Sequence, residues 1–224
     1  MSTLISGNGK LLEEKPKFSR VIRVSAHLLS WIFHPLFIPL YVTIFLSYIH
    51  PYAFVALSER GKIFKLIFVF VNTALFPGMA VFLMWRLKFT QSIFLRTQKE
   101  RIIPYAAAMV FYFWAWYVSR SLQDNEKVFT GFLFGSFLTV IAAWMANIYF
   151  KVSMHAIAMG GMVCFFILLA MQGSFSMGIY LSAAIFVAGL VCTCRLLVSD
   201  HYPFEVYAGF LLGVISQGIA TWFV

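Results

Sequence analysis

The stretch CRLLVSDHYPFEVYAGFLLG, residues 194–213, places Arg195, His201 and Glu205 between two long apolar runs. His201 and Glu205 are four residues apart, so a helix starting near them would hold both side chains on one face, about one turn apart. The carboxylate can then accept a hydrogen bond from one imidazole nitrogen, which leaves the other nitrogen free to attack. The spacing therefore predicts a histidine nucleophile oriented by a carboxylate, with a phosphohistidine as the implied intermediate.

Two further polar clusters interrupt the apolar sequence: RTQKERIIP, residues 96–104, and KVSMH, residues 151–155. The second supplies another imidazole, His155, which would protonate the leaving oxygen. Arginine donates two hydrogen bonds to phosphoryl oxygens, lysine offers a point charge and serine serves a remaining oxygen, so this inventory suits a phosphate group. The candidate phosphate-binding residues are Arg195, Ser153, Lys99, Arg101, Lys151 and Arg96. Lys99 and Arg101 are favoured within the first cluster.

Pro203 follows His201 by two residues. A proline in the first turn would start the last helix there and bring its positive end close to the bound anion. The sequence holds no H-E-x-x-H, no D-x-D and no cysteine pair of zinc type, so we expect neither a metal nor another cofactor.

Composition places these clusters in a membrane protein. Of the 224 residues, 62% are hydrophobic and 11% are charged. Seven runs approach the roughly twenty apolar residues that a spanning helix needs. They are residues 26–49, 63–85, 102–119, 128–150, 155–172, 177–194 and 204–223. We expect an all-α, polytopic helical membrane protein with a polar N-terminal tail over residues 1–25 and a single membrane domain over residues 26–224.

The order of the runs predicts how the clusters meet. Two crossings separate each cluster from the next, so all three reach the same face of the membrane. Prolines at positions 35, 39 and 77 predict kinks in the first two runs. His34, directly before the first of these prolines, either serves the kink or lines a substrate entrance. Gly209 and Gly213, four residues apart, predict a close-packed helix face.

Lysine and arginine give the chain a formal net charge of +9. They are spread over short loops instead of forming one stripe interleaved with aromatic residues, so membrane flanks and an anionic ligand explain them better than nucleic acid. Twelve lie on the side of the three clusters and five on the other. By the positive-inside rule this predicts a multi-pass cell-membrane protein whose site faces the cytoplasm, although five of the twelve are the candidate phosphate ligands.

The three clusters resemble the motifs of the type 2 phosphatidic acid phosphatases, a family related to bacterial acid phosphatases and vanadium haloperoxidases. Arg195, His201 and Glu205 are similar to the third motif, S-R-x5-H-x3-D, with cysteine in the serine position and glutamate for aspartate. VSMH keeps the serine and histidine of the second motif, P-S-G-H, as Ser153 and His155, without its proline and glycine. The first motif, K-x6-R-P, is matched only by the basic residues and proline of RTQKERIIP.

The resemblance implies a metal-independent enzyme that hydrolyses a phosphate monoester or pyrophosphate of a membrane lipid. It implies a six-helix core over residues 63–224, with His201 as nucleophile, His155 as acid and Glu205 as the orienting carboxylate. Two alternatives are open. The same site could pass the phosphoryl group to another lipid, or the chain could be a non-catalytic phospholipid-binding or transport protein. Neither the particular lipid nor the oligomeric state is specified by these motifs.

Overall fold

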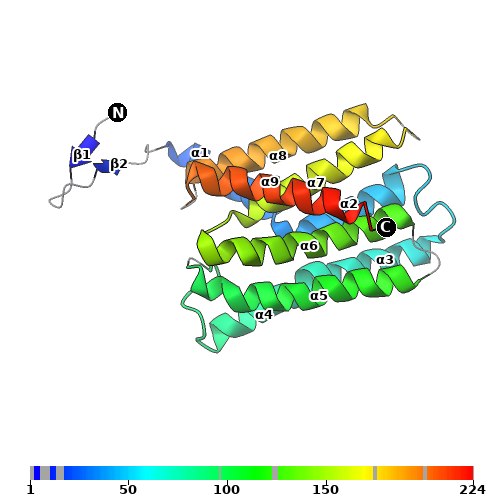
Figure 1. Cartoon of the computed structure of the whole chain (residues 1–224), viewed down its shortest axis with the longest axis horizontal. Helices are drawn as coiled ribbons and strands as arrows, with labels where there is room; N and C mark the ends of the chain where they lie inside the picture. The colour runs from blue at the N-terminus through cyan, green and yellow to red at the C-terminus, as the bar shows by residue number, and fades with distance from the viewer. Residues whose placement is uncertain are drawn as a thin grey trace.

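A computed structural model describes residues 3–5, 11–13, 18–95, 97–122, 126–173, 176–198 and 201–223. Within these residues, seven helical segments are long and apolar enough to cross a membrane, and they lie together in one bundle (Figure 1). The segments are Arg20–Ile49, Glu59–Arg86, Lys99–Ser121, Lys127–Tyr149, Met154–Met171, Gly178–Val198 and Pro203–Ala220. The predicted all-α, polytopic membrane fold is confirmed.

The first two spans are each built from several helical pieces, and three of these pieces have one of the predicted prolines in their first two residues. Proline lacks an N–H and cannot continue the hydrogen-bond ladder of a helix. The pieces of the first span are α1 (Arg20–Ile32), the 3-10 turn η1 (Pro35–Phe37), α2 (Ile38–Ile44) and the π-helix η2 (Phe45–Ile49). Those of the second are α3 (Glu59–Phe70), the π-helix η3 (Val71–Leu75) and α4 (Phe76–Arg86).

The other five spans run without a break over most of their length. They are α5 (Ile102–Ser121), preceded by the 3-10 turn η4 (Lys99–Arg101), then α6 (Lys127–Tyr149), α7 (Met154–Met171), α8 (Gly178–Val198) and α9 (Pro203–Ala220). Helix α9 begins at Pro203, as the sequence predicts.

The N-terminal region departs from the sequence prediction in two ways. Helix α1 begins at Arg20 rather than at residue 26, because the Ser19 hydroxyl accepts a hydrogen bond from the Ile22 N–H (3.4 Å) and caps the helix. Before it, the short strands β1 (Thr3–Ile5) and β2 (Leu11–Glu13) pair in antiparallel register. The polar composition of residues 1–25 did not predict this hairpin.

Two carbonyls near the proline breaks accept hydrogen bonds from tyrosine hydroxyls. Pro77 has no N–H to offer the Thr73 carbonyl four residues earlier, and the Tyr112 hydroxyl of α5 donates to that oxygen (3.3 Å). Similarly, α1 ends at Ile32, and the Tyr41 hydroxyl of α2 donates to the Ile32 carbonyl (2.7 Å). Backbone groups in hydrocarbon must find protein partners, so these bonds make the kinks tolerable.

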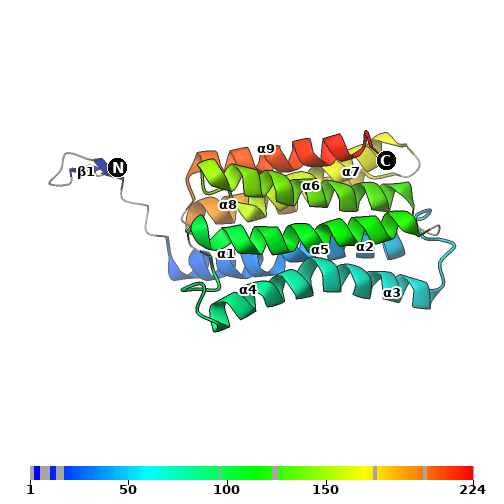
Figure 2. The same cartoon turned by 60° about the horizontal axis from the view of Figure 1, so that its bottom comes forward.

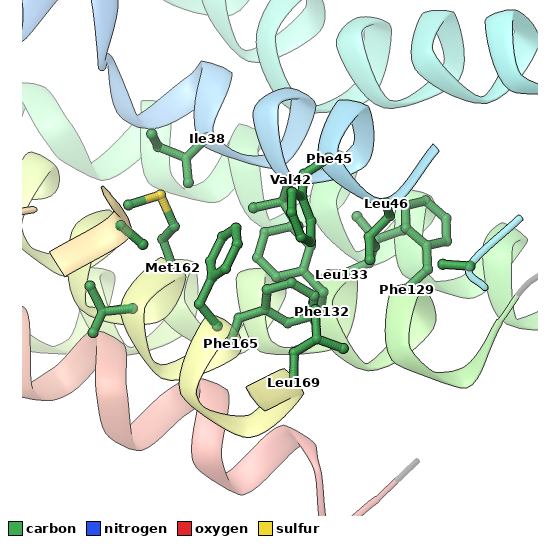
Figure 3. Close-up of a cluster of buried hydrophobic side chains, with 14 of the residues drawn as sticks. Ile38, Val42, Phe45, Leu46, Phe129, Phe132, Leu133, Met162, Phe165 and Leu169 are labelled. Atoms are coloured by element: carbon green, nitrogen blue, oxygen red, sulfur yellow. The ribbon is translucent and has the colours of Figure 1, made fainter. Parts of the chain in front are cut away.

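The core lies where the first span meets α6, α7 and α8 (Figure 3). Val42, Leu46, Phe129 and Leu133 are almost completely enclosed there. Large apolar side chains also cover the outside of the bundle, as expected for a surface that faces lipid tails. The first span therefore shares one core with α6, α7 and α8.

Helices α7 and α9 approach so closely that their glycines contact backbone. A Cβ on Gly213 would overlap the Ile157 carbonyl oxygen, and one on Gly160 would overlap the Phe210 carbonyl oxygen. A Cβ on Gly209 would lie 3.1 Å from the Ser153 carbonyl oxygen. The predicted close-packed face is thus used inside the chain, and it joins the two helices whose starts carry His155 and His201.

We expect Gly213→Ala to lower the stability of the bundle by about 1 to 3 kcal/mol, because the added methyl group must push the backbones of α7 and α9 apart. Gly218→Ala, in the same helix, is the matched control, since a Cβ there meets nothing within 4 Å. The midpoint of thermal unfolding in detergent would be measured for both. Equal midpoints for the two variants would contradict backbone contact at Gly213.

Candidate functional site

The structure brings the three polar clusters to one end of the bundle, at the left in Figures 1 and 2, where α5, α7 and α9 begin and α8 ends. Hydrogen bonds connect them directly. The Ser153 N–H donates to the Glu205 carbonyl (3.2 Å), which ties the second cluster to the third. A guanidinium N–H of Arg101 donates to the Val152 carbonyl (2.9 Å), which ties the first cluster to the second.

His201 and Glu205 form a buried pair at the start of α9. The Nδ1 of His201 lies 2.8 Å from Oε2 of Glu205, and the same oxygen accepts the Tyr202 N–H (3.1 Å). A carboxylate only accepts hydrogen bonds, so Nδ1 carries the imidazole proton and Nε2 keeps its lone pair. The hydrogen bond expected from the four-residue spacing is present. It fixes the tautomer of His201 in which Nε2 is unprotonated and can attack as a nucleophile.

The surroundings of His201 keep its imidazole neutral. Burial lowers its pKa from the usual 6.5, and the nearby guanidinium groups of Arg101 and Arg195 lower it further. The hydrogen bond and negative charge of Glu205 act in the opposite direction and offset part of this effect. The net direction is downward, so the neutral, nucleophilic form of His201 prevails at pH 7.

Ser153 and Lys151 lie in the turn that begins α7. The Ser153 side chain is fully buried, and its Oγ accepts the Ala156 N–H (3.4 Å), which caps the helix. Lys151 is half-buried two residues earlier. Both lie at the end of the bundle that holds His201, and their predicted role in phosphate binding stays a prediction.

The basic residues of the first cluster differ in position. Arg101 is buried and donates from Nε to the Leu95 carbonyl (3.0 Å), in addition to its bond with Val152. It therefore holds two loops together while its charge acts on both His201 and Glu205. Lys99 lies exposed on η4, two residues before Arg101. Arg96 lies outside the described residues.

His155 is fixed by the first span. Its Nε2 lies 3.0 Å from the carbonyl oxygen of Ser30, so this nitrogen carries a proton and donates it to the carbonyl. The carbonyl is accessible because α1 ends at Ile32. Only Nδ1 of His155 is then left to exchange a proton with a ligand.

His34 joins this group, which the sequence left undecided. Its ring lies edge-on to that of His155, with centroids 5.4 Å apart. Its Nδ1 accepts the Leu36 N–H (3.4 Å), so a neutral His34 carries its proton on Nε2. Arg195, in the last turn of α8, is close enough to act electrostatically on His34, His155 and His201. Among the described residues, the guanidinium groups of Arg101 and Arg195 therefore act on the imidazole of His201, as does the carboxylate of Glu205, and such a concentration of positive charge suits an anion.

No protein-family model, curated protein or solved structure matches this chain. The resemblance of its clusters to the type 2 phosphatidic acid phosphatases stays a prediction. Within the described ranges, no three His, Cys, Asp or Glu side chains group as a metal site would require.

Sequence reasoning did not assign three contributors to this region: His34, the Ser30 carbonyl and a reciprocal amide pair. In that pair the Gln98 side chain donates to the Asn147 carbonyl (2.8 Å) and the Asn147 side chain donates to the Gln98 carbonyl (2.9 Å). An ionisable residue inside a span is a functional candidate by default, so His34 could have been given more weight. The amide pair joins residues distant in the sequence and leaves no local signal.

We expect Arg101→Ala to lower the unfolding midpoint in detergent, since it removes two buried, charge-assisted hydrogen bonds, each worth about 1.5 to 3 kcal/mol. Lys99→Ala is the matched control two residues away, and it should leave the midpoint unchanged because its side chain is exposed. A midpoint unaltered by Arg101→Ala would show that the arginine does not hold the loops.

We expect the imidazole of His201 to titrate below pH 6.5, and Glu205→Gln to lower this pKa further because the raising effect of the carboxylate is lost. NMR of the protein labelled at histidine, with His201→Asn to assign the signal, measures both values. A His201 pKa above 6.5, or one raised by Glu205→Gln, would overturn the account of the pair.

Proposed function

We propose that this protein is an integral-membrane phosphatase that hydrolyses a phosphate monoester or pyrophosphate of a membrane lipid at the site formed by His201, His155 and Arg195. The supporting observation is the buried hydrogen bond from His201 Nδ1 to Glu205, which leaves Nε2 unprotonated beside a concentration of positive charge. The charge distribution along the chain favours a site on the cytoplasmic side.

In the first step, Nε2 of His201 attacks phosphorus, and the bond from phosphorus to the lipid oxygen breaks. The leaving oxygen takes a proton from Nδ1 of His155, whose Nε2 stays bonded to Ser30. In the second step, water attacks the phosphohistidine and gives a proton back to His155, which releases phosphate and restores both rings. Arg195 and Arg101 supply positive charge that offsets the charge of the transferring group.

Two features of the site suit this sequence of steps. Glu205 favours the positive charge that develops on His201 when Nε2 bonds to phosphorus, in the way an acidic partner supports an imidazolium. The charges of Arg195 and His34 disfavour a protonated His155. The negative charge of the bound phosphate group offsets this effect and so favours the protonated form. The two histidines thereby take different roles in one site.

The deciding experiment measures phosphate release by detergent-purified protein over a panel of lipid phosphates and pyrophosphates, with chelator present. We expect turnover by the wild type, and a loss of more than about 10³-fold in His201→Asn because the nucleophile is removed. His27→Asn, an exposed histidine on α1, is the control and should retain full activity.

Each other outcome has a definite meaning. Tight lipid-phosphate binding without turnover would identify a binding or transport protein. Phosphoryl transfer to an added lipid without release to water would identify a phosphotransferase. Full activity in His201→Asn would show that another residue carries the reaction.

A further inference from the structure

A groove of about 210 Å³ lies between the first span, α7 and α8. Its lining is apolar or aromatic: Phe33, Tyr41, Val42, Phe45, Met162, Phe166, Tyr180, Ala183, Ala184 and Val187. Three of these residues, Val42, Phe45 and Met162, also belong to the buried cluster drawn in Figure 3. It is larger than an engineered cavity of about 150 Å³ that accommodates benzene, so it has room for a segment of hydrocarbon chain.

The groove lies below the candidate site along the same two helices, α7 and α8. Met162 and Phe166 follow His155 by two and three turns on one face of α7, and Ala184 precedes Arg195 by three turns on one face of α8. Helix α7 runs away from the site and α8 runs back to it. The groove residues on both helices therefore lie about 10 to 16 Å below His155 and Arg195, at about 1.5 Å of rise per residue. Phe33, directly before His34, lines its near end.

Aromatic side chains close the far end. The ring of Phe45 lies 4.9 Å from that of Phe166 and 5.2 Å from that of Tyr180. On the outer side, Ala183 is exposed, so the groove opens toward the bilayer past a small side chain. The groove therefore has the charged site at one end, apolar walls along its length and an opening toward the bilayer at Ala183.

We propose that this groove holds a hydrocarbon chain of the substrate while its phosphate lies at His201, His155 and Arg195, beside His34, so that the substrate is an amphiphile that enters sideways from the bilayer. The inference rests on the proposed function. An anionic head matches the positive charge at the top of the groove, and a hydrocarbon tail matches its apolar walls. A second groove, lined by Phe37, Gly78, Phe82 and their neighbours, is apolar too, but α7 and α8, which carry His155 and Arg195, contribute nothing to its wall.

The first test compares a long-chain lipid phosphate with a short-chain, water-soluble analogue. Ala183→Trp places a large side chain in the groove from an exposed position, so the fold should tolerate it. We expect it to lower the ratio of kcat/KM for the long-chain over the short-chain substrate by about tenfold or more, because the chain loses its apolar site. Gly78→Phe fills the other groove, where a Cβ meets nothing within 4 Å, and should leave the ratio unchanged.

The second test does not depend on turnover. A lipid phosphate with a photoreactive diazirine part-way along one chain is irradiated with the His201→Asn protein. We expect crosslinks on α7 near Met162 and on α8 near Val187, suppressed by excess unlabelled lipid phosphate and not by neutral diacylglycerol. Labelling spread over the outside of the bundle, or equally suppressed by diacylglycerol, would overturn the groove proposal.

The two proposals fail separately. If wild-type protein releases phosphate but the chain crosslinks elsewhere, the groove assignment is wrong and the phosphatase stands. If no phosphate is released while the crosslinks map to the groove, the groove binds a lipid phosphate and the hydrolytic assignment is wrong.

Discussion

The arrangement of this protein depends on one constraint: a carbonyl freed inside a hydrocarbon layer must find a partner within the protein. Proline breaks in the first two spans free such carbonyls, and side chains from other helical pieces take them. The Tyr41 and Tyr112 hydroxyls donate to two of them, and the His155 imidazole donates to another, the Ser30 carbonyl. The same requirement that makes the kinks tolerable therefore orients an imidazole of the candidate site.

The remaining groups of the site are held mainly through backbone atoms. Ser153 and Glu205 meet through main-chain N–H and carbonyl, and Arg101 reaches two carbonyls from two loops. The backbone bond between Ser153 and Glu205 fixes the second and third clusters without a flexible side chain, and the Arg101 side chain that ties the first cluster to the second is itself buried. Such support is what a catalytic constellation needs, since small displacements of reacting groups have large effects on rate.

The sequence predicted those parts of the structure that depend on local spacing. The seven runs follow from apolar composition, the start of the last helix follows from Pro203, and the contact of His201 with Glu205 follows from their four-residue spacing. It did not predict the packing of the first span against α7 and α8, because apolar helices carry no signal of which neighbour they choose. The π-helical turns and the reciprocal pair of Gln98 and Asn147 are long-range or strained features of the same kind.

The glycine contacts between α7 and α9 also determine how the molecule can deform. Backbone pressed against backbone has no rotamers to exchange, so the starts of these helices, with His155 and His201, keep a fixed separation. The first span is held by side chains, which can slide and repack. Warming or a thinner bilayer would therefore loosen the first span first, and with it both the wall that carries His34 and the Ser30 carbonyl that orients the imidazole of His155, while the backbones at the starts of α7 and α9 stay in register.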